Sequence, residues 1–328
     1  MSDTLLQVRD LKVHFPVRTG GVLRATHQML KAVDGVSFDL KAGETLGIVG
    51  ESGCGKSTLG RAVLRLLPPT AGQVVWLGED MTHLAGDDLK ARRAHMQIVF
   101  QDPLASLDPR MTAGDIIAEP LRNYHPNLSK SEIAGRVAEM MTHVGLLPSM
   151  LNRYPHEFSG GQCQRIGIAR AMILKPKLIV CDEPVSALDV SIRAQVVNLL
   201  MDLQKTFGLS MLFISHDLAV VRHISHRVLV LYLGRMMELA ARDSLYRNPR
   251  HPYTQALMSA VPIPDPDKER AKPRIILSGD LPSPLAPPSG CVFRTRCPKA
   301  TEICARVEPV TEQAGSDHAV WCHHWRET

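Results

Sequence analysis

A glycine-rich segment, GESGCGKS at residues 50–57, constrains this chain more than any other part of its sequence. A short apolar run precedes it, and apolar residues at helical spacing follow it, so the local order is strand, loop and helix. Glycines let successive backbone N–H groups face phosphate oxygens, Lys56 can reach the β- and γ-phosphates, and Ser57 can offer its hydroxyl to Mg²⁺. The segment therefore predicts a phosphate-binding loop, or P-loop, for Mg-ATP. We expect ATP contacts from Gly50, Glu51, Ser52, Gly53, Cys54, Gly55, Lys56, Ser57 and Thr58.

Apolar runs of strand length recur along the chain and alternate with helical patterns. They cover residues 97–101, 178–181, 211–215 and 227–232. Buried strands that alternate with helices are typical of a parallel sheet covered on both faces. The predicted fold class is α/β, with the RecA-like core of a P-loop NTPase.

The middle of the chain departs from this alternation. Its pattern is helical, with a capping box at Ser129 and Glu132 ahead of an apolar stripe. We expect a helical subdomain at about 103–166, inserted in a nucleotide-binding domain that spans residues 1–260.

The last part of the chain has a different composition. Residues 261–290 contain eight of the 23 prolines, and four of the seven cysteines lie beyond them. We expect residues 261–328, the C-terminal extension, to consist of a proline-rich linker and a small cysteine-rich region.

Composition excludes several other classes of protein. The net charge of +5, from 38 basic and 33 acidic residues, is too mild to indicate a nucleic-acid partner. The first residues lack a basic stretch followed by an apolar run, so we expect no signal peptide. No apolar segment approaches the ~20 residues that cross a bilayer, so membrane spans in any complex would come from other chains.

A P-loop enzyme needs a second Mg²⁺ anchor and a group that activates the attacking water. The apolar run that ends at Cys181 is followed by two carboxylates, Asp182 and Glu183. We expect Asp182 to hold Mg²⁺, directly or through water, and Glu183 to act as the general base.

Ser159, Gly160, Gly161 and Gln162 open a long helical stretch and predict a second anion-binding helix start. An ordinary helix cap is the alternative interpretation. The Ser-Gly-Gly-Gln sequence resembles the signature motif of the ATP-binding cassette (ABC) family. The resemblance implies that this motif grips the γ-phosphate bound to the opposite cassette of a head-to-tail dimer.

Other positions extend the resemblance over about residues 5–250. Gln101 resembles the glutamine that senses Mg²⁺ and contacts membrane subunits, and His216 resembles the switch histidine that holds the γ-phosphate. Asp189, in SALD at 186–189, resembles the loop that crosses the dimer interface. Phe15 resembles the aromatic residue that stacks on adenine, although a strand phenylalanine is more often part of the core.

By this resemblance the site residues fall into four groups. Catalysis is assigned to Glu183, His216 and Gln101. Mg²⁺ is assigned to Ser57, Gln101 and Asp182. Phe15, Gln101 and His216 join the P-loop residues in binding ATP, and Ser159, Gly160, Gly161, Gln162 and Asp189 bind it in trans. Cys163 stands where the family more often has a basic residue.

Three stretches, at 101–112, 248–257 and 279–291, resemble ATPase subunits of bacterial dipeptide and oligopeptide importers. The resemblance implies two membrane-spanning permease subunits, a second, homologous cassette subunit and an extracytoplasmic peptide-binding protein as partners. It also implies a peripheral location on the cytoplasmic face of the inner membrane. A nickel importer of the same subfamily and a non-transport ABC ATPase are the alternatives. A GTPase is disfavoured because no Asn-Lys-x-Asp guanine-binding motif is present.

Four cysteines close together in the extension indicate a metal site, because a chain without a secretion signal rarely builds disulfides. They are Cys291, Cys297, Cys304 and Cys322, with gaps of 5, 6 and 17 residues. Zinc, with His318, His323 or His324 as further ligands, competes with a [4Fe–4S] cluster, and a metal-free structural role is the third interpretation. Zinc sites favour short gaps within each ligand pair, so the wide spacing favours the iron–sulfur cluster. The peptide-importer resemblance implies the same cofactor.

Overall fold

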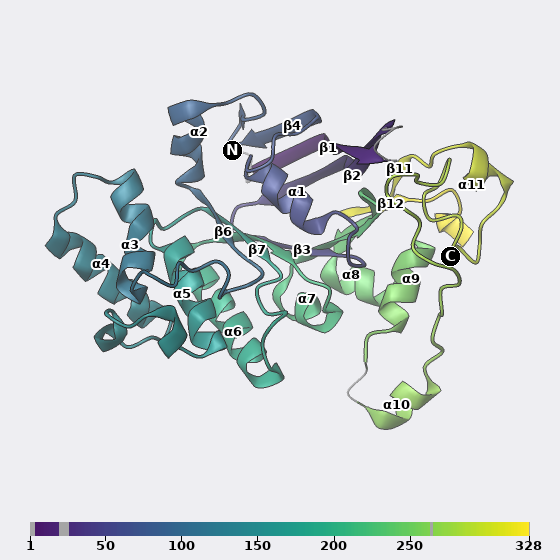
Figure 1. The fold of residues 1–328 in the computed structure, drawn as a ribbon. Coiled ribbons are helices and arrows are strands. Elements are labelled where there is room, and N and C mark those ends of the chain that lie inside the picture. Colours follow the sequence, from purple (N-terminus) through teal and green to yellow (C-terminus); the bar gives the residue numbers. More distant parts are fainter. Residues whose placement is uncertain (1–3, 20–25, 263–264, 328) are drawn as a thin grey trace. The chain divides into compact units, whose positions relative to one another are not determined.

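The computed structural model describes residues 4–19, 26–262 and 265–327 (Figure 1). Their internal contacts divide them into two compact units that interleave along the chain. The helical unit consists chiefly of residues 83–215, together with 40–45. The P-loop unit contains residues 5–39 and 46–82 and the chain from 216 onwards.

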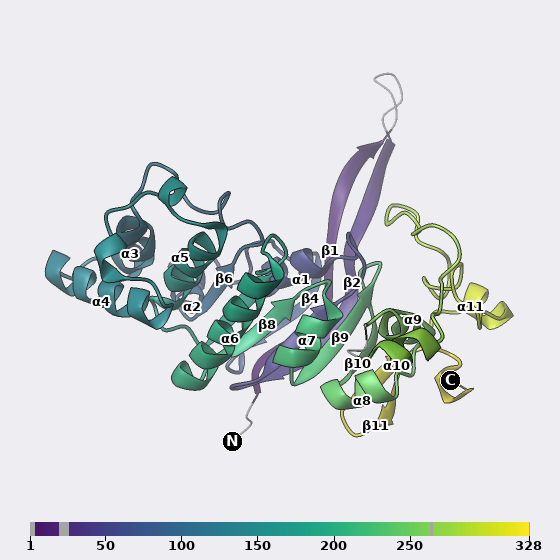
Figure 2. The same ribbon diagram turned by 90° about the horizontal axis from the view of Figure 1, so that it is seen from below.

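One sheet of the P-loop unit has four strands in the order β2-β1-β4-β5. They are β1 (Thr4–Thr19), β2 (Thr26–Lys41), β4 (Ala71–Trp76) and β5 (Glu79–Asp80). Figure 2 shows β1 and β2 as a long pair lying side by side.

Apolar residues alternate along β1, but the alternation changes phase in the middle of the strand. Leu6 and Val8 are fully buried, and so are Leu11 and Val13, which have the opposite parity. The register with β4 shifts at this point, and Asp10 adopts a left-handed conformation with φ 44°. The bulge thus inserts one residue and keeps both halves of the strand facing the core.

The second sheet in this unit contains β3 (Thr45–Val49), β9 (Arg227–Tyr232) and β10 (Arg235–Ala241). β3 pairs with β9 in parallel, and β9 pairs with β10 antiparallel. All five residues of β3 are buried, as a central strand requires. The helices of this part are α1 (Lys56–Val63), α7 (Leu218–Ile224), α8 (Arg242–Arg247) and α9 (Pro252–Ser259), of which α8 and α9 pack on β10.

The C-terminal extension continues this sheet. β12 (His318–Trp321) pairs antiparallel with β10, and β11 (Thr311–Gly315) pairs with β12. Two short helices, α10 (Pro266–Ala271) and α11 (Glu302–Arg306), and a final 3-10 turn at Trp325–Glu327 complete it. The pairing of β10 with β12 fixes the extension to the P-loop unit through main-chain hydrogen bonds.

A buried carboxylate reinforces this junction. Glu238 on β10 is fully buried and accepts hydrogen bonds from the backbone N–H groups of Arg250 (2.8 Å) and His251 (2.9 Å). Its Oε1 atom also lies 2.7 Å from Nε2 of His318 on β12. Burial of a carboxylate is costly unless its oxygens are satisfied, so Glu238 holds β10, the turn before α9 and β12 in one arrangement.

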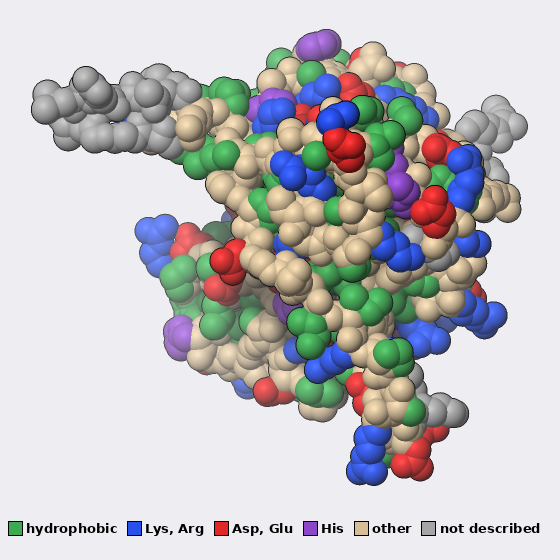
Figure 3. Space-filling model, turned by 90° about the vertical axis from the view of Figure 1, so that its right-hand side faces the viewer, with side chains coloured by type: hydrophobic (Ala, Val, Ile, Leu, Met, Phe, Trp, Pro, Cys, Tyr) green, Lys and Arg blue, Asp and Glu red, His purple; other side chains and the backbone are tan. Residues whose placement is uncertain are grey.

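Figure 3 looks toward the extension and shows Lys and Arg side chains interspersed with Asp and Glu. They do not gather there into one basic patch, in keeping with the mild net charge of +5. Among the helices of the described residues, none combines the length and the apolar composition that a membrane crossing requires.

The helical unit contains three parallel strands, β6 (Met96–Val99), β7 (Leu178–Asp182) and β8 (Ser210–Ile214), with β7 between the other two. These strands and β9 lie where the sequence predicts them, and the predicted α/β class with a parallel sheet is confirmed. The helices of the unit are α2 (Gly86–Arg93), α3 (Ala113–Tyr124), α4 (Lys130–His143), α5 (Gly160–Met172) and α6 (Val190–Phe207), with 3-10 turns at Pro148–Met150 and Pro155–Glu157.

Helices α3, α4 and α5 pack on one another, and α5 also contacts β6 and α6. The predicted capping box at the start of α4 is present. Ser129 accepts a hydrogen bond from the backbone N–H of Glu132, whose carboxylate accepts one from the N–H of Ser129. Val137, Met140 and Met141 of the predicted apolar stripe are buried.

Candidate functional site

The P-loop connects the end of β3 to the start of α1, in the predicted order. Gly50 and Gly55 both have a positive φ, 154° and 103°. A Cβ atom on Gly50 would lie 2.1 Å from the carbonyl oxygen of Leu231, and one on Gly55 would lie 2.0 Å from that of Ala32. Because strands β9 and β2 approach the loop so closely, only glycine fits at these two positions.

Lys56 is buried within the loop. Its Nζ atom donates hydrogen bonds to the carbonyl oxygens of Gly50 (2.8 Å) and Glu51 (2.9 Å). The loop therefore wraps around a cationic group at the start of α1, where the first backbone N–H groups lack intrahelical partners. This arrangement offers positive charge and N–H donors to a phosphate.

Cys54 of the same loop is almost completely buried. Burial raises the pKa of its thiol to about 11, although Lys56 acts in the opposite direction. A thiol in this state is protonated and unreactive, so Cys54 contributes to the shape of the loop rather than to redox chemistry.

In the helical unit, Asp182 ends β7 with an exposed fraction of only 1%, and Glu183 follows it. Glu183 adopts a left-handed conformation with φ 47°, and its N–H donates to the carbonyl oxygen of Ile214 (3.0 Å). A non-glycine residue in this conformation carries backbone strain, which is frequent at functional positions. Gln101 donates a hydrogen bond from Nε2 to Oε2 of Glu183 at 3.2 Å. Two of the predicted catalytic residues therefore lie together.

Ser159 is the N-cap of α5 and forms a capping box with Gln162. The Ser159 hydroxyl accepts from the N–H of Gln162 (3.3 Å), and the Gln162 side chain accepts from the N–H of Ser159 (2.9 Å). The side chains of Ser159 and Gln162 thus act as an ordinary helix cap, as the alternative interpretation of the sequence expects. It leaves the N–H groups of Gly160 and Gly161 in the first turn without intrahelical partners, so anion binding there stays compatible with the cap.

The two signature glycines differ in the space around them. A Cβ atom on Gly160 would meet only Leu188, at 3.9 Å, whereas one on Gly161 would lie 2.5 Å from Cγ2 of Ile192. Gly161 therefore allows α5 to pack close to α6, whereas Gly160 is exposed and free of such a contact.

The remaining predicted residues are distributed over both units. Asp189 is exposed at the N-terminus of α6 in the helical unit. His216 is exposed and Phe15 is half-buried on β1, both in the P-loop unit. Phe15 is thus not a fully buried core residue, and its contact with adenine stays a prediction.

Sequence analysis missed two residues that contact the P-loop. Tyr253 on α9 accepts a hydrogen bond from the backbone N–H of Glu51 at 3.1 Å. Arg296 of the extension donates from NH1 to both carboxylate oxygens of Glu51, at 3.0 and 2.8 Å. Tyr253 lies in one of the stretches typical of peptide importers, but no local pattern marks either residue as a neighbour of the loop.

The four cysteines of the extension line one narrow cavity, together with His251, His323 and His324. All four are free thiols, and Cys291, Cys304 and Cys322 are buried. The backbone N–H of Cys291 donates to the carbonyl oxygen of Cys304 (2.8 Å), which joins two of the ligand-bearing segments. The fold therefore brings together residues that lie up to 31 positions apart, from 291 to 322.

Burial, with the neighbouring thiols as a smaller cause, raises the pKa of Cys291 to about 12 and that of Cys322 to about 11. A cationic metal centre would stabilise such thiols as thiolates. Within the described residues, no group of three or more His, Cys, Asp and Glu side chains is arranged to hold a metal ion. The four thiols thus share a cavity, and a metal bound by them stays a prediction.

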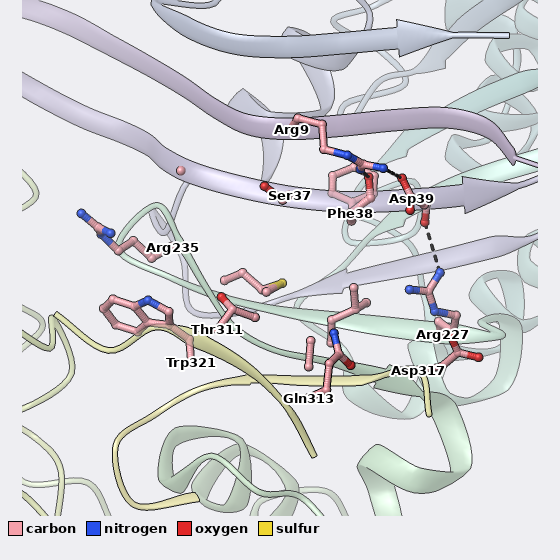
Figure 4. A pocket seen from close by; sticks show the side chains of 14 residues that line it. Arg9, Ser37, Phe38, Asp39, Arg227, Arg235, Thr311, Gln313, Asp317 and Trp321 are labelled. Atoms are coloured by element: carbon pink, nitrogen blue, oxygen red, sulfur yellow. Dashed lines mark hydrogen bonds and ion pairs between the residues drawn. The ribbon is translucent and has the colours of Figure 1, made fainter. Parts of the chain in front are cut away.

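A larger cavity of about 590 Å³ lies elsewhere in the P-loop unit (Figure 4). Two of its arginines are paired with carboxylates: Arg9 with Asp39 at 2.5 Å, and Arg235 with Asp34 at 2.8 Å. Arg227 donates to the carbonyl oxygen of Asp39 at 3.1 Å. No residue of the P-loop lines this cavity, so it is distinct from the phosphate site.

Comparison with known proteins gives two family matches on this chain. Residues 33–186 match the model of the ABC transporter family, and residues 237–304 match that of the oligopeptide/dipeptide transporter C-terminal region. The oligopeptide transport ATP-binding protein OppF of Salmonella typhimurium is 63% identical over 319 residues, which cover 97% of this chain and 95% of that protein. The corresponding protein AppF of Bacillus subtilis is 56% identical over 322 residues, covering 98% and 97%.

Solved structures agree with these matches. A dimeric ATP-binding cassette in a post-hydrolysis state, bound to ADP and Pi, superimposes with a TM-score of 0.64 and 28% identity, and covers 73% of this chain and 99% of its own. The protein cbiO1 of Clostridium perfringens, part of the ABC transporter complex cbiONQ, gives a TM-score of 0.64 with 26% identity, over 75% and 92% of the two chains. The fold predicted from the P-loop is confirmed.

Proposed function

The chain belongs to the ABC transporter family of ATP-binding proteins, and from this membership we propose that it powers a membrane importer of oligopeptides or dipeptides. One observation carries the proposal: a single chain contains both the cassette match and the C-terminal region that the peptide transporters share. The relatives named as oligopeptide transport ATP-binding proteins match over nearly the whole of this chain, which supports the same substrate class.

For the P-loop unit, we propose that the loop N–H groups and Lys56 bind the phosphates of ATP, and that Ser57 ligates Mg²⁺. Lys56 is buried among loop carbonyls, so its ammonium is held at the start of α1, where a phosphate would replace those carbonyls as its partner. Phe15 is proposed to stack on adenine, and His216 to hold the γ-phosphate.

For the helical unit, we propose that Asp182 helps to bind Mg²⁺ and that Glu183 is the general base. The hydrogen bond from Gln101 supports this assignment, because an amide donor orients the carboxylate without protonating it. Ser159, Gly160, Gly161, Gln162 and Asp189 are proposed to act on ATP held by a second cassette. The cassette bound to ADP and Pi among the similar structures is dimeric, which supports such an assembly.

For the cysteine cavity, we propose a [4Fe–4S] cluster ligated by Cys291, Cys297, Cys304 and Cys322. Four free thiols on one cavity are the donor set that such a cluster requires. When bound, the cluster would cross-link segments of an extension too small to have a large core of its own.

The complex around the chain is also a proposal. We place it at the cytoplasmic face of the inner membrane, with two permease subunits, a homologous second cassette and an extracytoplasmic peptide-binding protein. The resemblance to peptide importers supports all four assignments.

Purification from detergent-solubilised membranes of the native cell tests the proposed function. An affinity-tagged chain should retain two permeases and a second cassette, and vesicles containing the complex should take up labelled oligopeptides when ATP is present. The same complex with Lys56→Ala is the matched control and should assemble without transport. Uptake of Ni²⁺ rather than peptide, or purification of the chain without permeases, would contradict the proposal.

A further inference from the structure

Glu51 of the P-loop is bound by the C-terminal extension through its side chain. The guanidinium group of Arg296 contacts both carboxylate oxygens, at 3.0 and 2.8 Å. The side chain of Arg296 is 11% exposed and that of Glu51 is 28% exposed, so the ion pair is largely shielded from water. Arg296 also lies over the ring of Tyr232, 5.9 Å from its centroid, which restricts the conformation of the guanidinium.

The backbone of Glu51 is held as well. Its N–H donates to the hydroxyl of Tyr253, a fully buried residue. The ring of Tyr253 packs against Tyr232 and against Phe293, with centroids 4.8 and 5.3 Å apart. Phe293 lies between the first two cysteines of the cavity, so the same short segment of the extension supports both contacts to Glu51.

Glu51 in turn contacts the group that binds the nucleotide, because its carbonyl oxygen accepts a hydrogen bond from Nζ of Lys56. Glu51 is itself an acidic residue in a loop that binds a polyanion. Without a cation beside it, the carboxylate of Glu51 would repel the phosphates of the nucleotide. The repulsion would be strong because the Glu51 side chain is largely shielded from water. The guanidinium of Arg296 offsets this repulsion, and its hydrogen bonds to Glu51 attach the P-loop to the extension.

We propose that Arg296 is a positioning residue of the nucleotide site, which neutralises and anchors Glu51 so that the extension sets the affinity for ATP. This inference rests on the proposed binding of ATP to the P-loop. It assigns the extension a role in nucleotide affinity, in addition to any role in the stability of the chain.

Binding of Mg-ATP to the full-length chain, measured by titration calorimetry, tests the proposal. Arg296→Ala should raise the dissociation constant roughly tenfold, the scale of a lost charged hydrogen bond. Arg296→Lys keeps the positive charge and should recover most of the affinity. Arg326→Ala is the matched control, because Arg326 pairs with Glu312 on the surface of the same extension and does not contact the loop. It should bind ATP as the unmodified chain does.

A double-mutant cycle separates charge neutralisation from a purely structural role. In the Glu51→Gln background no carboxylate is left unpaired, so a further Arg296→Ala change should alter the affinity less than twofold. An equal loss of affinity in both backgrounds would overturn the proposal, and so would unchanged affinity in Arg296→Ala alone. Failure of the unmodified chain to bind Mg-ATP would instead contradict the proposed function.

Discussion

Gln101 donates a hydrogen bond to Glu183 at 3.2 Å, across 82 residues of sequence. The contact follows from topology, because β6 and β7 are neighbouring parallel strands, and Gln101 and Glu183 lie within two residues of their carboxyl ends. The sheet itself thus places side by side the proposed catalytic carboxylate and the glutamine proposed to sense Mg²⁺. The strained φ of 47° at Glu183 turns the chain sharply at the same point.

Glu183→Gln is expected to retain ATP binding and to lose hydrolysis by roughly 10²–10⁴-fold, the usual effect of removing a general base. The amide is nearly isosteric with the carboxylate, so the strand end should keep its conformation. The γ-phosphate then stays intact, and ATP should trap a closed dimer of cassettes. ATPase assays of the assembled complex and size-exclusion chromatography with ATP measure the two effects. Near-normal turnover would remove Glu183 from the role of base.

Lys56→Ala and Gly160→Asp are expected to separate binding from dimer closure. Loss of the buried ammonium of Lys56 should abolish tight binding of ATP to the isolated chain. Gly160 has open space where a side chain would lie, so aspartate there should leave the fold and nucleotide binding intact. Its carboxylate would occupy the place of the partner's γ-phosphate, and hydrolysis should fail.

Gly160 is a cleaner position for this experiment than Gly161, where a Cβ atom would collide with Ile192. Nucleotide affinity is measured on the isolated chain, and hydrolysis on the complex. Equal loss of affinity in Lys56→Ala and Gly160→Asp would mean that Gly160 faces the nucleotide of its own chain.

Sequence alone predicted the elements whose signals are local. The P-loop, the buried strands and the capping box at Ser129 all depend on residues within a few positions of one another. The family resemblance then supplied roles for residues such as Gln101 and His216, whose own surroundings in the sequence are unremarkable.

The parts that were missed depend on contacts between distant segments. Pairing of β12 with β10 joins residues about eighty positions apart, such as Val320 and Glu238. Arg296 and Glu51 are 245 positions apart, and neither belongs to a periodic pattern. The bulge in β1 at Asp10 could be suspected from the change of phase in its apolar residues, but its geometry requires the partner strand.

The cysteine cavity predicts a coloured protein. Purified without oxygen, the chain should be brown, with broad absorbance near ~400 nm and about four irons per chain. Serine at Cys291, Cys297, Cys304 or Cys322 should bleach it. Serine at Cys54, Cys163 or Cys181 is the control and should not, because these buried thiols lie outside the cavity.

The cassette has its own core, so the serine variants of the cavity should still bind ATP, with affinity reduced no further than in Arg296→Ala. Their main defect should be in stability or in assembly. A colourless anaerobic preparation with stoichiometric zinc would exclude the cluster and keep a metal site. Absence of both metals, with all four thiols freely titratable, would exclude both.

His251 predicts how stability depends on pH. Its Nδ1 atom accepts a hydrogen bond from the backbone N–H of Tyr253 (3.0 Å) and so caps helix α9. Burial lowers the pKa of the imidazole to about 4, although the nearby Glu238 acts in the opposite direction. The folded chain therefore keeps His251 neutral at a pH where the unfolded chain protonates it. Stability from this group is fully present above the ordinary pKa of about 6.5, and is lost as the pH falls toward 4.

The variant His251→Asn is the control, because asparagine is a good N-cap and does not titrate. Between about pH 7.5 and about pH 5, the free energy of unfolding of the unmodified chain should fall by about 2 kcal/mol more than that of the variant. Urea unfolding of both proteins at the two pH values measures this difference. Other groups that titrate in the interval affect both proteins alike and cancel in the comparison. Parallel losses of stability in the two proteins would show that His251 accepts a proton in the folded chain, with its capping hydrogen bond already broken.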